Sequence, residues 1–165
     1  MRGANLRLWA GHKLPENADE FYFEPDVLLH DGDTVRIGRY EFRFVETPGH
    51  TEGVVSIFWN VHYKGKEYLA GMFGGAGQAA LTNEHLDRDG LPYTLREDYV
   101  RSVERIIGEP VEVHIGNHPS NNKHVDKAER LTEDYNPFIE ENTWVAFLEG
   151  CRDEVAAKYG IEIKQ

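Results

Sequence analysis

Cysteine is almost absent from this sequence, since Cys151 is the only one in 165 residues. A single cysteine excludes an internal disulfide and any metal site built on a Cys-X-X-Cys pair, and it favours a reducing compartment. We therefore expect a cytoplasmic location. A secreted or periplasmic location is the alternative if a signal sequence precedes the chain.

Positive charge is also scarce. Lysine and arginine number 18 against 29 aspartates and glutamates, which gives a net charge of −11. Such a field repels phosphate backbones and anionic lipid surfaces. Long apolar runs are missing as well, because the longest, such as residues 54–59, have the length of a strand. We therefore expect no nucleic-acid partner and no membrane span.

The chain divides into two regions of different character. Residues 1–25 are expected to be an N-terminal extension, because their second half is a charged loop interrupted by glycine and proline. Residues 26–165 are expected to form one domain, because regular patterns of apolar residues run through them without an internal repeat.

Alternation of apolar and polar residues predicts two hairpins in the first half of this domain. Tyr40, Phe42 and Phe44 fall on one face of the first hairpin. A glycine-rich stretch, residues 71–77, follows the second hairpin and predicts a flexible loop over the site. The predicted strands are residues 34–37, 40–46, 54–63 and 67–70.

Helical periodicity marks the second half of the domain. One helix is predicted over residues 95–107, ended by Gly108, and it leads into a short apolar strand over residues 111–115. A last helix begins at Asn136-Pro137 or at Asn142-Thr143 and ends at Gly160. This order predicts an α+β fold in which helices cover one sheet face. The other face needs a cover that this chain does not obviously supply.

Two histidines stand where predicted strands end. His50 lies in the tight loop Thr47-Pro48-Gly49-His50-Thr51, and His118 lies in the loop Gly116-Asn117-His118-Pro119-Ser120-Asn121-Asn122. Neutral imidazole is a good zinc ligand, so the pair is a candidate for metal binding. The plainer alternatives are a loop histidine bonded to backbone for His50 and a turn residue for His118. His114, inside the predicted strand, is expected to be a core or sheet-surface residue.

These segments resemble the metallo-β-lactamase superfamily. Asp31-Gly32-Asp33-Thr34-Val35, Thr47-Pro48-Gly49-His50-Thr51-Glu52-Gly53 and the following strand are similar to the central segment of that family. Val113-His114-Ile115-Gly116-Asn117-His118-Pro119 and Asn136-Pro137-Phe138 resemble the third subclass of true metallo-β-lactamases. The likeness covers roughly residues 26–150. It implies half of an αββα sandwich, with a mixed or antiparallel sheet and helices on one face.

The resemblance also implies a site. In the family the corresponding histidines bind zinc, which implies metal-ligand roles for His50 and His118. Ser120 and Asn121, on the second loop, are expected to bind substrate. The family's HxHxDH motif, which supplies most of the ligands, occurs nowhere in this sequence. We therefore expect this C-terminal half to be inactive alone, with no catalytic residue of its own and with weak or absent zinc binding.

Two functions remain open at the level of sequence. The first is a zinc-dependent hydrolase that acts on a small molecule and needs the missing N-terminal half. The second is a non-catalytic remnant or assembly module. In the second case another copy of this chain covers the open sheet face in a homodimer.

Overall fold

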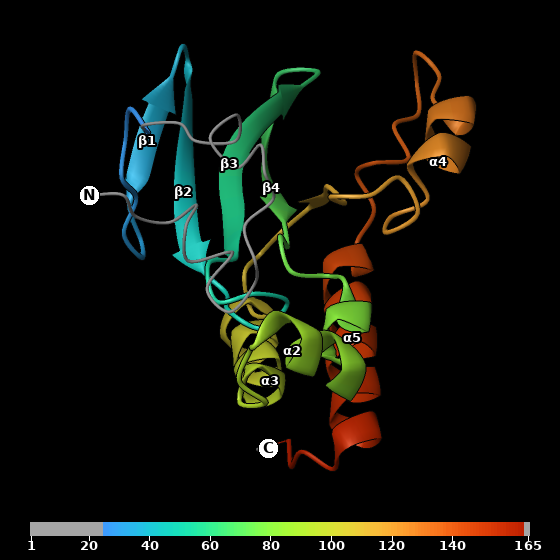
Figure 1. Ribbon diagram of the computed structural model, residues 1–165. Helices are drawn as coiled ribbons and strands as arrows, with labels where there is room; N and C mark the ends of the chain where they lie inside the picture. The colour runs from blue at the N-terminus through green and yellow to red at the C-terminus, as the bar shows by residue number, and fades with distance from the viewer. Residues whose placement is uncertain (1–24, 164–165) are drawn as a thin grey trace, which may run out of the picture.

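The computed structural model describes residues 25–163 and shows one five-stranded sheet with helices packed against part of it (Figure 1). The loop predicted over residues 1–25 lies outside the described residues, apart from Pro25. In chain order the elements are β1 Thr34–Ile37, β2 Tyr40–Glu46, β3 Val55–Tyr63, β4 Lys66–Met72, η2 Gln78–Leu81, α2 Asn83–Asp89, α3 Leu95–Ile106, β5 Val113–His114, α4 His124–Arg130 and α5 Thr143–Tyr159.

The sheet follows the chain order β1-β2-β3-β4-β5. The first four strands are antiparallel, and β4 pairs in parallel with β5. The two predicted hairpins are confirmed. Their turns contain Gly38 and Gly65, both with positive φ, a conformation that glycine adopts without steric cost.

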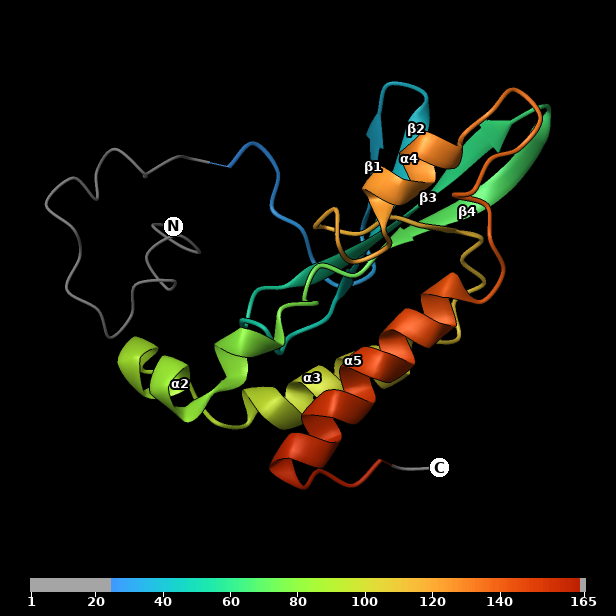
Figure 2. The same ribbon diagram turned by 90° about the vertical axis from the view of Figure 1, so that its right-hand side faces the viewer.

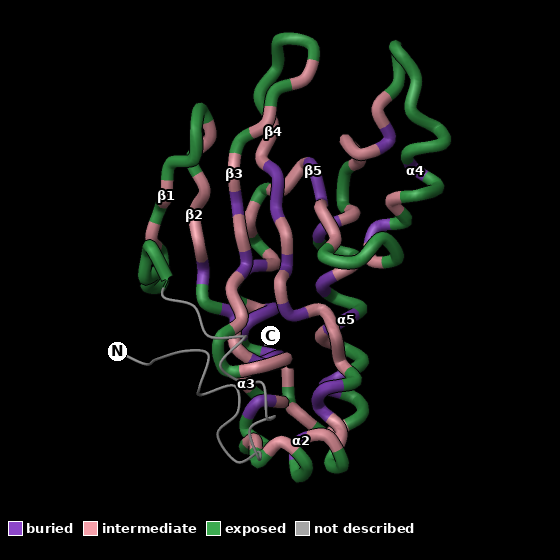
Figure 3. The backbone as a smooth tube through the Cα atoms, turned by 45° about the horizontal axis from the view of Figure 1, so that its top comes forward, coloured by how far each residue is buried: buried purple, intermediate pink, exposed green. Residues whose placement is uncertain are grey.

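Helices α3 and α5 form the second layer (Figure 2). They lie side by side against one end of the sheet, and α4 stands apart from them. Val45 on β2 and Phe58 on β3 face this layer, and the Phe58 ring meets the Trp144 ring of α5 edge to face at 5.8 Å. Burial is concentrated where the sheet meets these helices, whereas β1 is largely exposed (Figure 3). The core is therefore one-sided, as the α+β prediction required.

The opposite face of the sheet is apolar and only half-buried. The register places Phe42 opposite Trp59, and Phe44 opposite Ile57. The side chains on this open face are partly exposed and largely aromatic or branched: Tyr40, Phe42, Phe44, Val55, Ile57, Trp59, Val61, Tyr68 and Met72. The expectation that one face lacks a cover within the chain therefore holds for the described residues.

The second half of the chain differs in detail from its predicted pattern. Two helices of seven residues, α2 and α4, were not predicted, and neither is long enough to show a clear helical period. The predicted strand over residues 111–115 is reduced to Val113–His114. For α5 the later of the two proposed starts is correct, since Asn142 is the N-cap residue and Gly160 ends the helix in the left-handed conformation.

No helix within residues 25–163 has the length and apolar character that crossing a membrane requires.

Candidate functional site

The loop that carries His50 is held at both ends by buried polar contacts. Thr47 follows β2, and its hydroxyl shares a 2.9 Å hydrogen bond with the buried hydroxyl of Ser56 at the start of β3. The Thr47 amide donates to the Val54 carbonyl at 2.9 Å, and the Ser102 hydroxyl of α3 donates to the Pro48 carbonyl at 2.7 Å. These hydrogen bonds attach the loop to both the sheet and α3.

Gly49 allows the loop to touch α3. Its φ is +149°, and a Cβ atom at this position would lie 2.6 Å from the Cα of Tyr99. Any side chain would therefore strain the backbone and also collide with the helix. Because Gly49 directly precedes His50, its close approach to α3 fixes the position of the His50 backbone and so of the atom from which the imidazole extends.

The His50 ring has a defined partner. Its Nδ1 atom lies 2.6 Å from the carbonyl oxygen of Gly77. A carbonyl oxygen only accepts hydrogen bonds, so Nδ1 carries the hydrogen and Nε2 of the neutral ring keeps its lone pair. Metal-binding histidines in proteins are commonly held in this way, with the other ring nitrogen donating to a backbone carbonyl or a carboxylate.

The glycine-rich segment 73–77 supplies that carbonyl. Phe73 anchors it, because its buried ring meets the ring of Tyr99 edge to face at 5.7 Å. The Tyr99 hydroxyl donates to the Ala76 carbonyl at 3.4 Å. Residues 71 and 72, which were predicted to lie in this loop, belong to β4. These contacts pack the segment against α3, and its predicted flexibility stays a prediction.

Burial also determines the protonation of two reactive groups beside this segment. It raises the pKa of the Tyr99 phenol and that of the Cys151 thiol, which lies next to it. Both groups therefore stay protonated near neutral pH, and neither is a candidate nucleophile.

The second histidine, His118, is exposed in the loop between β5 and α4. Its carbonyl accepts from the Asn121 amide at 3.0 Å, which closes a turn around it. The Gly116 amide donates to Nε2 of His124 at 3.0 Å, and the His124 amide donates to the Pro119 carbonyl at 2.8 Å. The backbone that carries His118 is thereby tied to the first turn of α4.

The two histidine loops meet the same segment. The side-chain amide of Asn117 donates to the Gly74 carbonyl at 2.9 Å, three residues before the carbonyl that holds His50. The sequence placed Gly77 in a loop over the site and Asn117 in the His118 loop, but it did not show which groups they contact. A glycine-rich run and an asparagine-rich loop were the available signals, but neither reveals its partner.

The other two predicted site residues have different surroundings. Ser120 is exposed, whereas the Asn121 side-chain amide donates to Oδ1 of Asn117. Their assignment to substrate binding stays a prediction.

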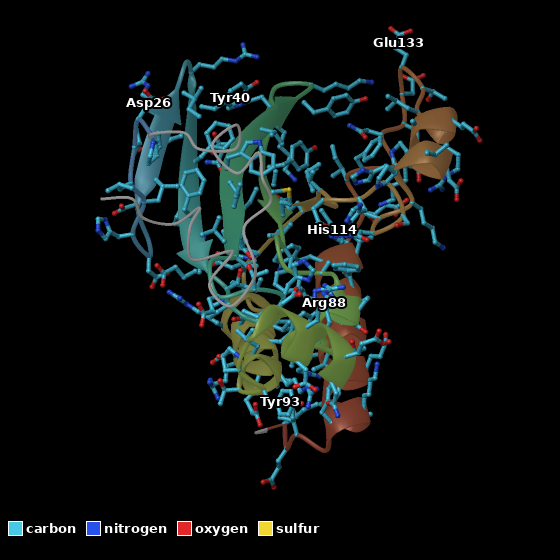
Figure 4. All side chains as sticks on the ribbon, in the orientation of Figure 1. Asp26, Tyr40, Arg88, Tyr93, His114 and Glu133 are labelled. Carbon is cyan, nitrogen blue, oxygen red and sulfur yellow. The ribbon has the colours of Figure 1, made fainter. Side chains whose placement is uncertain are left out.

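His114 is a core residue, which was one of the two alternatives predicted for it. It lies near the upper end of α5 in Figure 4 and is 1% exposed. Its ring packs against the rings of Trp144 and Phe147 at centroid distances of 5.5 and 4.7 Å. Neither ring nitrogen has a hydrogen-bond partner among the described residues. Burial, together with the nearby charges of Lys127 and His124, lowers the pKa of His114 to about 4.

The described chain does not contain a complete metal site. Within residues 25–163 no group of three or more His, Cys, Asp or Glu side chains is placed to hold an ion. A hollow of about 510 Å³ lies over the helix-side face of the sheet and is lined by Arg43, Asn60, His62 and Glu67 among others. It belongs to the opposite ends of the strands from His50, so it is separate from the two histidine loops.

Known proteins match this chain over part of their length. No protein-family model matches it. The human protein named acyl-coenzyme A thioesterase MBLAC2 is 29% identical over 84 residues, which are 51% of this chain and 26% of that protein. The chain therefore matches about a quarter of the length of this curated relative.

Solved structures match the fold more completely. BJP-1, a subclass B3 metallo-β-lactamase of Bradyrhizobium japonicum, has a TM-score of 0.73 at 20% identity, over 84% of this chain and 52% of its own. The FEZ-1 metallo-β-lactamase from Legionella gormanii has a TM-score of 0.68 at 23% identity, over 79% of this chain and 49% of its own. The chain therefore has the fold of about half of a metallo-β-lactamase, which is the fold that its sequence resemblance implied.

Proposed function

We propose that this chain supplies His50 and His118 to a zinc-dependent hydrolytic site of the metallo-β-lactamase type. The observation that carries the proposal is the 2.6 Å bond between His50 Nδ1 and the Gly77 carbonyl, which leaves Nε2 available to a metal. The remaining ligands would come from a segment with an HxHxDH motif, which these 165 residues lack. The chain spans about half the length of the solved structures that it matches, in accord with this division.

The residues present suit zinc but do not complete its coordination. Two neutral imidazoles are ligands that zinc accepts readily, and a catalytic zinc takes three protein ligands and one water. When bound, zinc lowers the pKa of that water to near 7 and so makes hydroxide available. The part that this chain plays is to hold the His50 nitrogen in place through Gly77 and to fix the backbone of His118 through its closed turn.

The proposal extends to hydrolysis and not to a particular substrate. Similar proteins are named for different activities, since one is called an acyl-coenzyme A thioesterase and others are called metallo-β-lactamases. A shared scaffold does not determine which bond is cleaved. We therefore propose a small-molecule substrate with a hydrolysable acyl bond as the broad class.

Calorimetric titration of the metal-free chain with zinc chloride tests the proposal. We expect weak binding by the wild type, because two imidazoles leave positions to water, and at least about tenfold weaker binding by His50→Ala. His62→Ala is the matched control, since His62 is an exposed histidine on β3 at the other end of the sheet. Unchanged binding by His50→Ala would refute the proposal. Stoichiometric zinc that resists chelator would also contradict it, because that requires a closed site in this chain.

A second function, an assembly module, is favoured by the open face of the sheet. Its half-buried aromatic and branched side chains form one continuous apolar face, and large faces of this kind are often sites of protein association. We propose that a second copy of this chain covers the face when no separate first half does. A two-fold pair needs only one self-complementary surface, and a stable one would bury roughly 2,000 Å² in total.

Sedimentation equilibrium at micromolar concentration tests the assembly proposal. We expect a dimer, and we expect Phe42→Glu to shift it toward monomer because the change buries a charge in the interface. Asn60→Glu is the control, because Asn60 lies on the helix-side face of the neighbouring strand. A wild-type species of 18.9 kDa, the mass of one chain, would refute the dimer.

A further inference from the structure

We infer that Asn117 is a positioning residue that fixes the His118 loop relative to His50 through the backbone of residues 74–77. The inference rests on the function proposed above and identifies how the two ligand loops are kept in register. It concerns a side chain that would touch neither metal nor substrate.

The connection is short and consists of hydrogen bonds at both ends of one segment. Asn117 Nδ2 donates to the Gly74 carbonyl at 2.9 Å, and His50 Nδ1 donates to the Gly77 carbonyl at 2.6 Å. Between these carbonyls, Ala76 accepts from the Tyr99 hydroxyl at 3.4 Å. Groups from three separate parts of the chain therefore bind one run of four residues.

The segment is packed closely enough to transmit a displacement. A Cβ atom on Gly74 would lie 2.2 Å from the Val55 carbonyl, and one on Gly77 would lie 2.9 Å from Cε1 of His50. The backbone therefore runs close to β3 at Gly74 and close to the imidazole at Gly77, so neither glycine has space for a side chain. We expect a shift at Gly74 to alter the position of Gly77, because three residues of one packed segment separate them.

Asn117 also fixes the loop on its own side. Its Oδ1 accepts from the side-chain amide of Asn121, whose backbone amide closes the turn onto the His118 carbonyl. Removing the Asn117 side chain therefore breaks two hydrogen bonds at once, the one to the Gly74 carbonyl and the one from the Asn121 side-chain amide. The same contacts give Asn121 a role in shaping the His118 turn.

Zinc affinity is sensitive to such arrangements. The ligands must reach one ion in tetrahedral geometry, and loss of a single outer contact commonly costs ten- to a hundredfold in affinity. His118 is exposed and next in sequence to Asn117, so the direction of its ring depends on how that backbone is held.

The experiment follows the ring resonances of His50 and His118 by NMR as zinc chloride is added to the full chain. We compare wild type with Asn117→Ala, and we use Asn60→Ala as the control because Asn60 is also an exposed asparagine. In wild type both rings should reach half-saturation at one zinc concentration. In Asn117→Ala that concentration should rise by about tenfold, while Asn60→Ala should match wild type.

Thermal unfolding of the same samples distinguishes a positioning role from a loss of folding. If Asn117 only positions the loop, Asn117→Ala and Asn60→Ala should unfold at the same temperature. If Asn117→Ala fails to fold, Asn121→Ala retains the Gly74 bond and should shift half-saturation in the same direction by less. An unchanged zinc concentration in the folded variants would overturn the inference alone. Different half-saturation points for the two rings in wild type would instead overturn the proposed shared site, and the inference with it.

Discussion

Acidification should weaken this fold through His114. In the folded chain its pKa is lowered to about 4, against 6.5 for an ordinary histidine, because its ring is buried against Trp144 and Phe147 and lies near Lys127. Between these two values the unfolded chain binds a proton that the folded chain does not. Stability must therefore fall as pH falls from about 6.5 toward 4.

The size of this effect follows from the two pKa values. One pKa unit corresponds to about 1.4 kcal/mol, so going from pH 7 to pH 4.5 should remove roughly 2 to 3 kcal/mol of stability through His114. This is a large part of the 5 to 15 kcal/mol that is typical of a domain. Urea unfolding at pH 7 and pH 4.5, monitored by tryptophan fluorescence, measures this loss of stability.

Comparison of variants isolates the contribution of this one group. His114→Leu keeps an apolar side chain in the same surroundings and removes the titrating ring, so its loss of stability should be smaller by roughly 2 to 3 kcal/mol. His62→Leu removes an exposed histidine and retains His114, and it should keep the response of the wild type. Equal losses in wild type and His114→Leu would show that the burial argument is wrong.

Three further predictions concern the candidate site. Gly49→Ala should destabilise the chain by about 2 kcal/mol or more in urea unfolding, since its Cβ would meet the Tyr99 backbone at a positive φ; an unchanged midpoint would contradict this. Gly77→Ala should weaken zinc binding in calorimetry by displacing the His50 ring, whereas Gly108→Ala, which has open space around it, should not; equal affinities would count against the role of Gly77. The purified chain should hydrolyse neither nitrocefin nor simple thioesters, because most of the metal ligands are missing. Turnover that disappears in His50→Ala would show that the site is more complete than we propose.

Local patterns in the sequence were enough for a large part of this fold. Alternation around Phe42 and Phe44 predicted the first hairpin. Glycines with positive φ stand at the predicted turns of both hairpins, Gly38 and Gly65, and at the end of α5, Gly160. These features depend on neighbours a few residues apart, so they can be read from a single stretch of chain. Both histidine loops follow strands, as predicted, the first after β2 and the second after β5. These two strands are not neighbours, since β3 and β4 lie between them in the sheet.

Contacts between distant residues were decided only in three dimensions. The partners of the candidate site, Gly77 for His50 and Gly74 for Asn117, are 27 and 43 residues away in the chain, and no local pattern encodes such pairs. Lys127 is another case, since it is 3% exposed although its ammonium group would favour water. An ion pair with Glu140 at 3.1 Å offsets that cost, and it forms only because the fold brings α4 next to the segment before α5.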